Sequence, residues 1–323
     1  MAETILEVRG LSKDFRIPGT GVLHPKMHRA VQDVSFTVRK GEAFGIVGES
    51  GCGKSTVAKL IMGLEKPTAG EIIFQGQRLD SLSEGERRPL RPKFQMVFQD
   101  SGSSLNPRKR IEDILAEPML YHKIVSRQEL SHRIDQLLDQ VGLSREMKNR
   151  YPHEFSGGQR QRICIARALS LDPELVILDE PVSALDVSVQ AQILNLLRDL
   201  QKELNLTCIF IGHGLGAVRY VSQRLAVMYM GRIVEMGGAQ ELFDNPVHPY
   251  TCALLDAAPV ADYAQRDRER LALAGEVSEA APEGGCSFRS RCPFAVPECA
   301  SADMKLRVYA GDHLSACMAG GKR

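Results

Sequence analysis

The stretch Gly48-Glu49-Ser50-Gly51-Cys52-Gly53-Lys54-Ser55-Thr56 decides the fold of this chain. It has the pattern G-x-x-x-x-G-K-[ST], between an apolar run typical of a buried strand, Ala43–Val47, and a one-faced helix pattern, Val57–Leu64. Glycines at such a turn let backbone N–H groups point at phosphate oxygens, and the helix N-terminus adds partial positive charge. Because both flanks fit, a chance glycine-rich turn is disfavoured. The stretch predicts a phosphate-binding loop in which Lys54 reaches the β- and γ-phosphates and Ser55 ligates Mg²⁺.

The composition is that of a globular chain. Of the 323 residues, 43% are hydrophobic and 25% are charged, which allows one large domain or two. Lys plus Arg number 41 and Asp plus Glu 40, so no overall basic field indicates a nucleic acid partner. Apolar runs such as Leu225–Met230 are far shorter than the roughly 20 residues of a membrane-spanning helix. Met1–Ile5 do not begin a secretory signal, so we expect a cytoplasmic chain that does not cross the membrane itself.

Two different patterns flank the core of the predicted fold. Ile5–Leu11 and Val34–Val38 alternate apolar and polar residues, which predicts an antiparallel flap ahead of the phosphate loop. Phe15 lies in this region, where its ring would either stack on a nucleotide base or pack in the core. From about Pro107 to Tyr151 the pattern becomes helical, and we expect a mainly helical insertion there.

Polar side chains follow three predicted strands. Gln99 ends one strand, Asp179-Glu180 follow the buried run Leu175–Leu178, and His213 follows Thr207–Ile211. In open α/β sheets, ligand groups gather at the carboxyl ends of the strands. Asp179 could hold Mg²⁺ through its water shell and Glu180 could deprotonate an attacking water, while His213 could donate to a γ-phosphate. The plain alternatives are strand-end acids that cap the next segment and a loop histidine with ordinary partners.

A second anion-binding end is predicted at Ser156-Gly157-Gly158-Gln159, which open a helix that runs to Leu169. A helix N-terminus with little side-chain bulk presents N–H donors and partial positive charge. These physical arguments alone do not say to which chain the bound nucleotide belongs.

These motifs occur in the order and spacing of an ATP-binding cassette, and the chain resembles a transporter ATPase subunit. Within that family it is similar to the F-type subunit of the oligopeptide/dipeptide importers. Three segments carry this closer likeness: Tyr151–Gln159, Asp179–Ser188 and Asn245–Thr251. The resemblance implies an α/β fold, a P-loop NTPase ABC nucleotide-binding domain with an antiparallel β subdomain and a helical subdomain, plus a small Cys-rich C-terminal domain.

The resemblance also implies roles for residues. ATP and Mg²⁺ would bind at Gly48–Thr56, with Phe15 stacking on the base and Gln99 contacting Mg²⁺ and the attacking water. Asp179 joins the Mg²⁺ ligands, Glu180 becomes the general base and His213 senses the γ-phosphate. The signature residues Ser156, Gly157, Gly158 and Gln159 would complete a partner's nucleotide site across a head-to-tail dimer, with Asp186 at the junction.

The implied domains are residues 1–262 for the ATP-binding domain, with the helical subdomain at about 107–170, and 263–323 for a regulatory or metal-cluster domain. The implied partners are a second, homologous ATPase subunit in a heterodimer, two integral membrane permease subunits and, indirectly, a periplasmic or extracellular solute-binding protein. The chain would then lie peripherally on the cytoplasmic face of the inner membrane.

Two positions depart from the family pattern. Gly212 and Gly214 flank His213, where the family usually has a small polar residue before the histidine and an acid after it. Glycines widen backbone freedom, which predicts a less rigidly held His213. Ser101 stands where the family commonly has proline, which bears on the shape of the loop after Gln99.

Four of the eight cysteines gather near the C-terminus, after a predicted helix at Ala264–Ala274: Cys286, Cys292, Cys299 and Cys317. Four thiolates could hold zinc or an iron–sulfur cluster, although the spacings are not the C-x2-4-C of zinc ribbons. Unligated reduced thiols are the third possibility. The resemblance favours a [4Fe-4S] cluster.

The sequence leaves three functions open. The first is an importer ATPase whose solute is a dipeptide or oligopeptide, with glutathione or nickel complexes as alternatives. The second is a soluble cassette protein acting on ribosomes or DNA, which commonly has tandem cassettes or a long coiled coil; this chain has one cassette and no sustained heptads. The third is a redox protein with incidental nucleotide binding, for which the sequence has no second cofactor motif.

Overall fold

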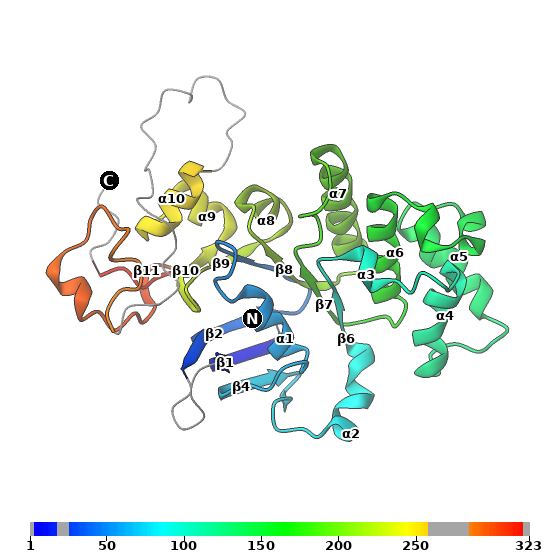
Figure 1. The fold of residues 1–323 in the computed structure, drawn as a ribbon, viewed down its shortest axis with the longest axis horizontal. Coiled ribbons are helices and arrows are strands. Elements are labelled where there is room, and N and C mark those ends of the chain that lie inside the picture. Colours follow the sequence, from blue (N-terminus) through cyan, green and yellow to red (C-terminus); the bar gives the residue numbers. More distant parts are fainter. Residues whose placement is uncertain (1–2, 18–25, 258–283, 319–323) are drawn as a thin grey trace. The chain divides into compact units, whose positions relative to one another are not determined.

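The computed structural model describes residues 3–17, 26–257 and 284–318 (Figure 1). The chain divides into two compact units. Unit 1 comprises Met1–Thr4, Val38–Ala43 and Ser81–Ile211, and unit 2 comprises Ile5–Thr37, Phe44–Asp80 and Gly212–Arg323. The predicted helix at Ala264–Ala274 lies outside the described residues.

Unit 1 contains three parallel strands in the order β6-β7-β8: Phe94–Val97, Leu175–Asp179 and Thr207–Gly212. Every residue of β7 and β8 is buried. Such continuous apolar strands are typical of a parallel sheet that is covered on both faces. Because the strands are parallel, their carboxyl ends lie at one edge, where Gln99 and Asp179-Glu180 follow.

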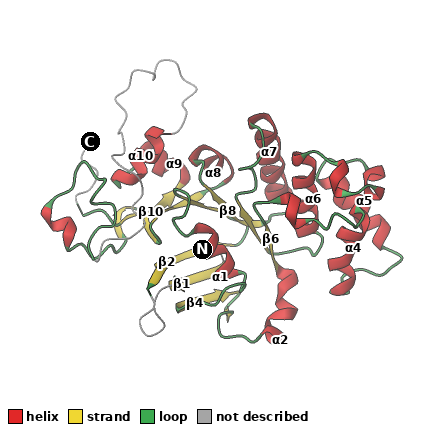
Figure 2. Ribbon diagram, in the orientation of Figure 1, coloured by secondary structure: helices red, strands yellow, loops and turns green. Residues whose placement is uncertain are grey.

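Among the helices of unit 1, α4, α5 and α6 lie side by side (Figure 2). Of these, α4 and α5 lie within the segment where the sequence predicts helix, and α5 buries Ile134, Leu137 and Leu138 on one face. Gly142 follows α5 with a φ of 67°, which suits the left-handed residue after a helix end. The helical elements of unit 1 are α2 (Glu84–Arg87), η1 (Arg88–Lys93), α3 (Ser101–Ser104), α4 (Ile111–Tyr121), α5 (Leu130–Gln140), η2 (Arg145–Asn149), η3 (Pro152–Glu154), α6 (Gly157–Leu169) and α7 (Val187–Glu203).

Unit 2 contains five strands that pair in the order β11-β12-β10-β9-β3. The strand β3 pairs in parallel with β9, and β9 pairs antiparallel with β10. The strands β9 and β10 form a hairpin, whose turn at Met230-Gly231 has φ values of 44° and 81°, as type I′ turns require. The bounds are β3 (Ala43–Val47), β9 (Arg224–Tyr229), β10 (Arg232–Gly238), β11 (Arg307–Ala310) and β12 (His313–Ser315).

Unit 2 also holds most of a four-stranded antiparallel sheet, in the order β2-β1-β4-β5. The predicted flap ahead of the phosphate loop is therefore confirmed, with β4 added after the loop. Its strands are β1 (Thr4–Arg16), β2 (Met27–Arg39), β4 (Ala69–Phe74) and β5 (Gln77–Arg78). The helical elements of unit 2 are α1 (Lys54–Ile61), α8 (Leu215–Val221), α9 (Ala239–Asp244), α10 (Pro249–Ala257) and η5 (Pro297–Ala300).

The described part of the tail, residues 284–318, is built into unit 2. Its strand β12 pairs antiparallel with β10, Glu235 opposite Ser315. The fully buried Glu235 accepts hydrogen bonds from the backbone N–H of Val247 and His248, and its Oε1 lies 2.7 Å from Nε2 of His313. Neither short strand was predicted, because three or four residues carry too little alternation to be recognised.

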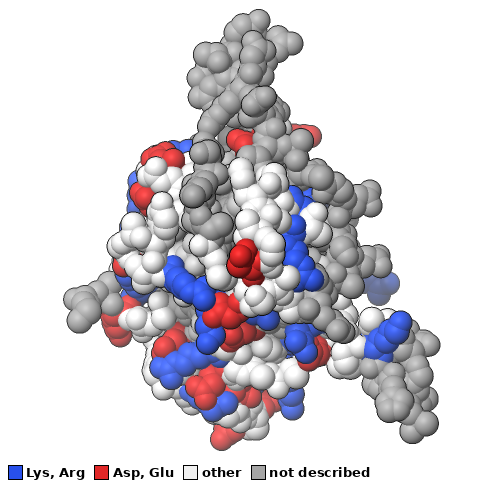
Figure 3. Space-filling model, turned by 90° about the vertical axis from the view of Figure 1, so that its left-hand side faces the viewer, with Lys and Arg blue, Asp and Glu red and all other residues white. Residues whose placement is uncertain are grey.

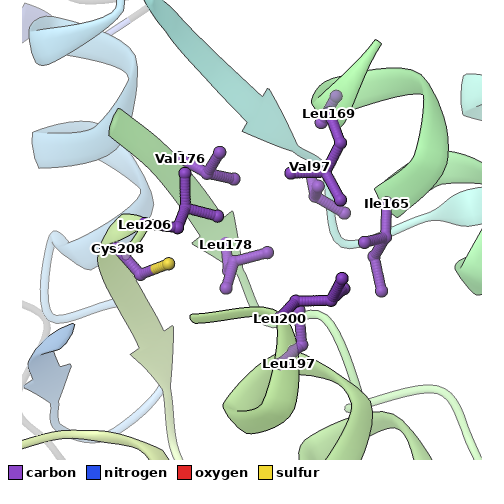
Figure 4. Close-up of a pocket in the computed structure, with 10 residues that line it drawn as sticks. Val97, Ile165, Leu169, Val176, Leu178, Leu197, Leu200, Leu206 and Cys208 are labelled. Atoms are coloured by element: carbon purple, nitrogen blue, oxygen red, sulfur yellow. The ribbon is translucent and has the colours of Figure 1, made fainter. Parts of the chain in front are cut away.

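A small apolar cavity lies in unit 1 between the strands β6–β8 and the helices α6 and α7 (Figure 4). Its volume of about 10 Å³ is at the lower limit for one water, and its aliphatic lining offers a water no set of polar partners. The cavity is a packing gap in the core and has no room for a ligand.

Replacement of Leu178, which lines this cavity and is 2% exposed, tests the packing. We expect Leu178→Ala to lower the free energy of unfolding by about 2–5 kcal/mol, because it enlarges a gap that the core does not fill. Val187 is 82% exposed, so Val187→Ala should change this free energy by less than about 0.5 kcal/mol. Urea titration of both variants gives the comparison, and equal effects would contradict the buried position of Leu178.

Candidate active site

The predicted phosphate loop connects β3 to α1 in unit 2. Gly53 precedes α1 with a φ of 103°, and no side chain of the described residues caps this helix. The first N–H groups of α1 are thus left for another acceptor. A Cβ at Gly53 would lie 2.2 Å from the carbonyl oxygen of Ala30, so close backbone approach requires glycine here.

Lys54 is 3% exposed, and its ammonium is held by the loop itself. Its Nζ donates to the carbonyl oxygens of Gly48 and Glu49, each at 2.8 Å. A buried cation needs such partners, and phosphate oxygens could replace them. The Sγ of Cys52 lies 3.6 Å from Nζ, but burial raises the pKa of this thiol, so it stays neutral at pH 7.

Two residues outside the motif hold the loop at Glu49. The Tyr250 hydroxyl accepts a hydrogen bond from the Glu49 N–H at 2.9 Å, and Arg291 makes two hydrogen bonds to the Glu49 carboxylate at 2.9 and 3.1 Å. The carboxylate raises the pKa of Arg291, which remains charged. Sequence reasoning missed both residues, since no spacing pattern connects them with the loop.

At the strand ends of unit 1, the structure brings Gln99 and Glu180 together. The Gln99 Nε2 donates to Glu180 Oε2 at 3.1 Å. Glu180 has a φ of 47°, and its N–H donates to the carbonyl of Ile211 at 2.9 Å. Asp179, at the end of β7, is 5% exposed. A carboxylate and an amide held side by side can orient a water for attack on phosphorus.

The predicted signature residues form the N-terminal end of α6 in unit 1. Ser156 caps α6, since its Oγ accepts from the Gln159 N–H at 3.3 Å while Gln159 Oε1 accepts from the Ser156 N–H at 3.0 Å. Gly158 is buried, and a Cβ there would lie 2.5 Å from Cγ1 of Val189. Ser156 itself is exposed, as is Asp186 at the start of α7. This end of α6 can therefore meet another molecule.

Phe15 and His213 lie in unit 2. Phe15 is half-buried on β1, with Nζ of Lys13 4.8 Å from its ring centroid. His213 is exposed and directly follows β8. Gly214 has a φ of −84°, a value open to any residue, so the glycine after His213 is not required by the backbone. Base stacking by Phe15 and phosphate sensing by His213 stay predictions.

The loop has a shape at Ser101 that proline would also allow. It is the first residue of α3, which Asp100 caps by accepting hydrogen bonds from the N–H groups of Gly102 and Ser103. Proline is well tolerated at that first helical position, so the departure from the family pattern is a compatible one.

The tail cysteines do not form a metal site in the described residues. No three His, Cys, Asp or Glu side chains of the parts described stand in a metal-binding arrangement. Burial raises the pKa of Cys286 to about 11, with smaller contributions from the thiols of Cys292, Cys299 and Cys317. The predicted [4Fe-4S] cluster therefore finds no support in the geometry of the described residues.

Basic and acidic side chains are interspersed on the face shown in Figure 3. Within residues 3–17, 26–257 and 284–318, the helices are all too short or too polar to cross a bilayer.

The fold and the loop define a P-loop nucleotide-binding protein, and comparison with known proteins identifies the family. The family described as ABC transporter matches residues 31–183, and the oligopeptide/dipeptide transporter C-terminal region matches residues 234–299. The chain is 51% identical to the oligopeptide transport ATP-binding protein AppF of Bacillus subtilis, over 98% of this chain and 97% of that protein. It is 46% identical to the di/tripeptide transport ATP-binding protein DppF of Pseudomonas aeruginosa, over 95% of each.

Solved structures agree. The dimeric ATP-binding cassette MJ0796 bound to ADP and Pi matches with a TM-score of 0.65 and 27% identity, over 73% of this chain and 99% of that one. The structure of cbiO1 from Clostridium perfringens, part of the cbiONQ transporter complex, matches with a TM-score of 0.66 and 29% identity, over 75% and 91%. The chain belongs to the ABC transporter family, in the oligopeptide/dipeptide branch of its ATP-binding subunits, and is an ABC-type ATPase. This confirms the family resemblance.

Two glycines of the loop form a matched pair for a stability test. Gly51 has a φ of 79° and open space around a Cβ, so Gly51→Ala should cost only backbone strain, about 1–2 kcal/mol. Gly53→Ala adds a clash with the Ala30 carbonyl, and we expect a total loss of about 2–5 kcal/mol in unfolding free energy. Urea unfolding without nucleotide measures both. A Gly53 variant as stable as the Gly51 variant would contradict the close approach.

Proposed function

We propose that this chain hydrolyses ATP to energise the import of dipeptides or oligopeptides through a membrane ABC transporter. The observation that carries the hydrolytic part is the hydrogen bond from Gln99 to Glu180, beside the buried Asp179. The peptide part rests on the relatives, which are named for oligopeptide and di/tripeptide transport.

In the proposed reaction, the N–H groups of Gly48–Thr56 and the Lys54 ammonium bind the phosphates of ATP, and Phe15 stacks on the base. Glu180 takes a proton from a water whose oxygen forms a bond to the γ-phosphorus. The bond from that phosphorus to the β–γ bridging oxygen breaks, which gives ADP and phosphate. Ser55, Gln99 and Asp179 would hold Mg²⁺, which would supply charge neutralisation at the phosphates. His213 donates to the γ-phosphate.

The proposed assembly contains two cassettes head to tail, so that Ser156–Gln159 complete the nucleotide site of a partner. Exposure of Ser156 and the dimeric form of MJ0796 support this arrangement. The partner is a second, homologous ATPase subunit, and the pair contacts two permease subunits at the cytoplasmic face of the inner membrane. A solute-binding protein acts on the far side. Uptake assays with labelled dipeptides, oligopeptides, glutathione and nickel complexes distinguish the solutes.

Replacement of Glu180 tests the catalytic assignment. We expect Glu180→Gln in the assembled transporter to lower steady-state ATP hydrolysis by about 10²- to 10⁴-fold, because the general base is lost, while ATP binding persists. Lys54→Ala should weaken ATP binding itself. Glu203→Gln, which changes an exposed acid at the end of α7, is the matched control and should leave both unchanged. Wild-type turnover in the Glu180 variant would refute the assignment.

We also propose that the four tail cysteines hold a [4Fe-4S] cluster, within a small Cys-rich domain at residues 263–323. Its support is the family resemblance alone, and the absence of a metal-binding arrangement in the described residues stands against it. The cluster would have a structural role, because the described tail has no core apart from unit 2.

Measurement of bound metal and sulfide tests for the cluster. Anaerobically purified protein should contain iron and acid-labile sulfide, and Cys292→Ser should remove both. Cys208→Ser, which alters a buried thiol of β8 outside the group, is the control and should leave the iron content unchanged. Stoichiometric zinc without sulfide, or no metal at all, would reject the cluster.

A further inference from the structure

All three polar groups of Glu49 are bound, each by a different part of unit 2. Its N–H donates to the Tyr250 hydroxyl at 2.9 Å, and its carbonyl oxygen accepts from Lys54 at 2.8 Å. Its carboxylate accepts two hydrogen bonds from the guanidinium of Arg291, at 2.9 and 3.1 Å. Glu49 thus joins the phosphate loop to the helix α10 and to the tail, 242 residues further along the chain.

The ion pair of Arg291 with Glu49 is largely buried. The two side chains are 8% and 25% exposed, and a bidentate pair of this kind fixes both distance and orientation. Arg291 also lies 3.5 Å from the Tyr229 hydroxyl, and its guanidinium carbon is 5.9 Å from the Tyr229 ring and 6.0 Å from the Phe288 ring. The position of the guanidinium is therefore set by several neighbours at once.

The tail that carries Arg291 is anchored in the same place. Phe288 is fully buried, with its ring centroid 5.3 Å from that of Tyr229 and 5.5 Å from that of Tyr250. Tyr250 is the residue whose hydroxyl accepts the Glu49 N–H. This packing fixes Phe288, whose carbonyl accepts a hydrogen bond from the Arg291 N–H at 3.0 Å, so the backbone that carries Arg291 is held beside the loop.

We propose that Arg291 is a positioning residue for the phosphate loop, through which the tail sets the affinity of the loop for the triphosphate of a nucleotide. This rests on the proposed function, in which the loop binds ATP. When phosphate arrives, Lys54 must exchange the carbonyls of Gly48 and Glu49 for phosphate oxygens. A loop that Arg291 holds in place keeps its shape during the exchange, so less of the binding free energy is spent on ordering it.

The test measures ATP binding to the full chain by calorimetry, together with KM and kcat of the assembled transporter. Arg291→Met removes the charge and keeps a long stem, and we expect the Kd for ATP to rise about tenfold, within the usual range of coupling between sites. KM should rise while kcat stays near wild type. Arg291→Lys, which cannot make the bidentate pair, should give a smaller rise. Arg307→Met is the matched control, because the Arg307 side chain is half-exposed and pairs with Asp303, four residues away.

A double-mutant cycle isolates the pair. Glu49→Gln should weaken ATP binding about as much as Arg291→Met, and the double variant no more than either alone, because one interaction is lost in all three. Wild-type Kd in folded Arg291→Met overturns the proposal. Should that variant fail to fold, the charge-reversed pair Arg291→Glu with Glu49→Arg decides. ATP binding stronger than in either single reversal supports the proposal, and binding no stronger overturns it.

ATP binding by Lys54→Ala separates the proposed function from the proposed role of Arg291. If Lys54→Ala binds ATP as tightly as wild type, the loop is not the nucleotide site and both statements fall. If Lys54→Ala loses binding but Arg291→Met does not, only the role of Arg291 is overturned.

Discussion

The buried ammonium of Lys54 is the constraint on which the phosphate loop depends. At 3% exposure it needs acceptors inside the protein, and the loop supplies the carbonyls of Gly48 and Glu49 at 2.8 Å. These carbonyls can face Lys54 only if the loop keeps its turn. The turn requires glycine at position 53, because the Ala30 carbonyl approaches the backbone there. The loop is thus already shaped before any phosphate enters it, and phosphate binding becomes an exchange of acceptors.

In unit 1 the fold holds two carboxylates in fixed positions at the strand ends. The buried strand β7 delivers Asp179 and Glu180 to the carboxyl edge of the parallel strands, and the Glu180 N–H is fixed to the strand β8 through Ile211. The left-handed φ of Glu180 marks a turn that the neighbouring bonds must maintain. Gln99 then lies against the carboxylate, so both groups can act on one water.

Local patterns predicted the parts of this protein that local physics determines. The loop follows from its own glycines, the helix α5 from the spacing of Ile134, Leu137 and Leu138, and the strand β7 from its unbroken apolar run. The pair of Arg291 with Glu49 could not be predicted, because charged residues form a quarter of the sequence and nothing local selects one partner 242 residues away. The cysteine spacing likewise gave candidate ligands but no geometry, since four thiols converge only as far as the surrounding fold brings them.

The contact of Gly53 with Ala30 joins two parts of unit 2 without any side chain between them. The turn after β9 adds to it, because the Gln32 N–H donates to the carbonyl of Gly231 at 2.8 Å and the Gly231 N–H donates to that of Cys52 at 2.9 Å. Backbone packed on backbone has no rotamers that could absorb a displacement. We therefore expect β2, the edge strand of the four-stranded sheet, and the phosphate loop to move as one rigid unit. A displacement of either one displaces the other.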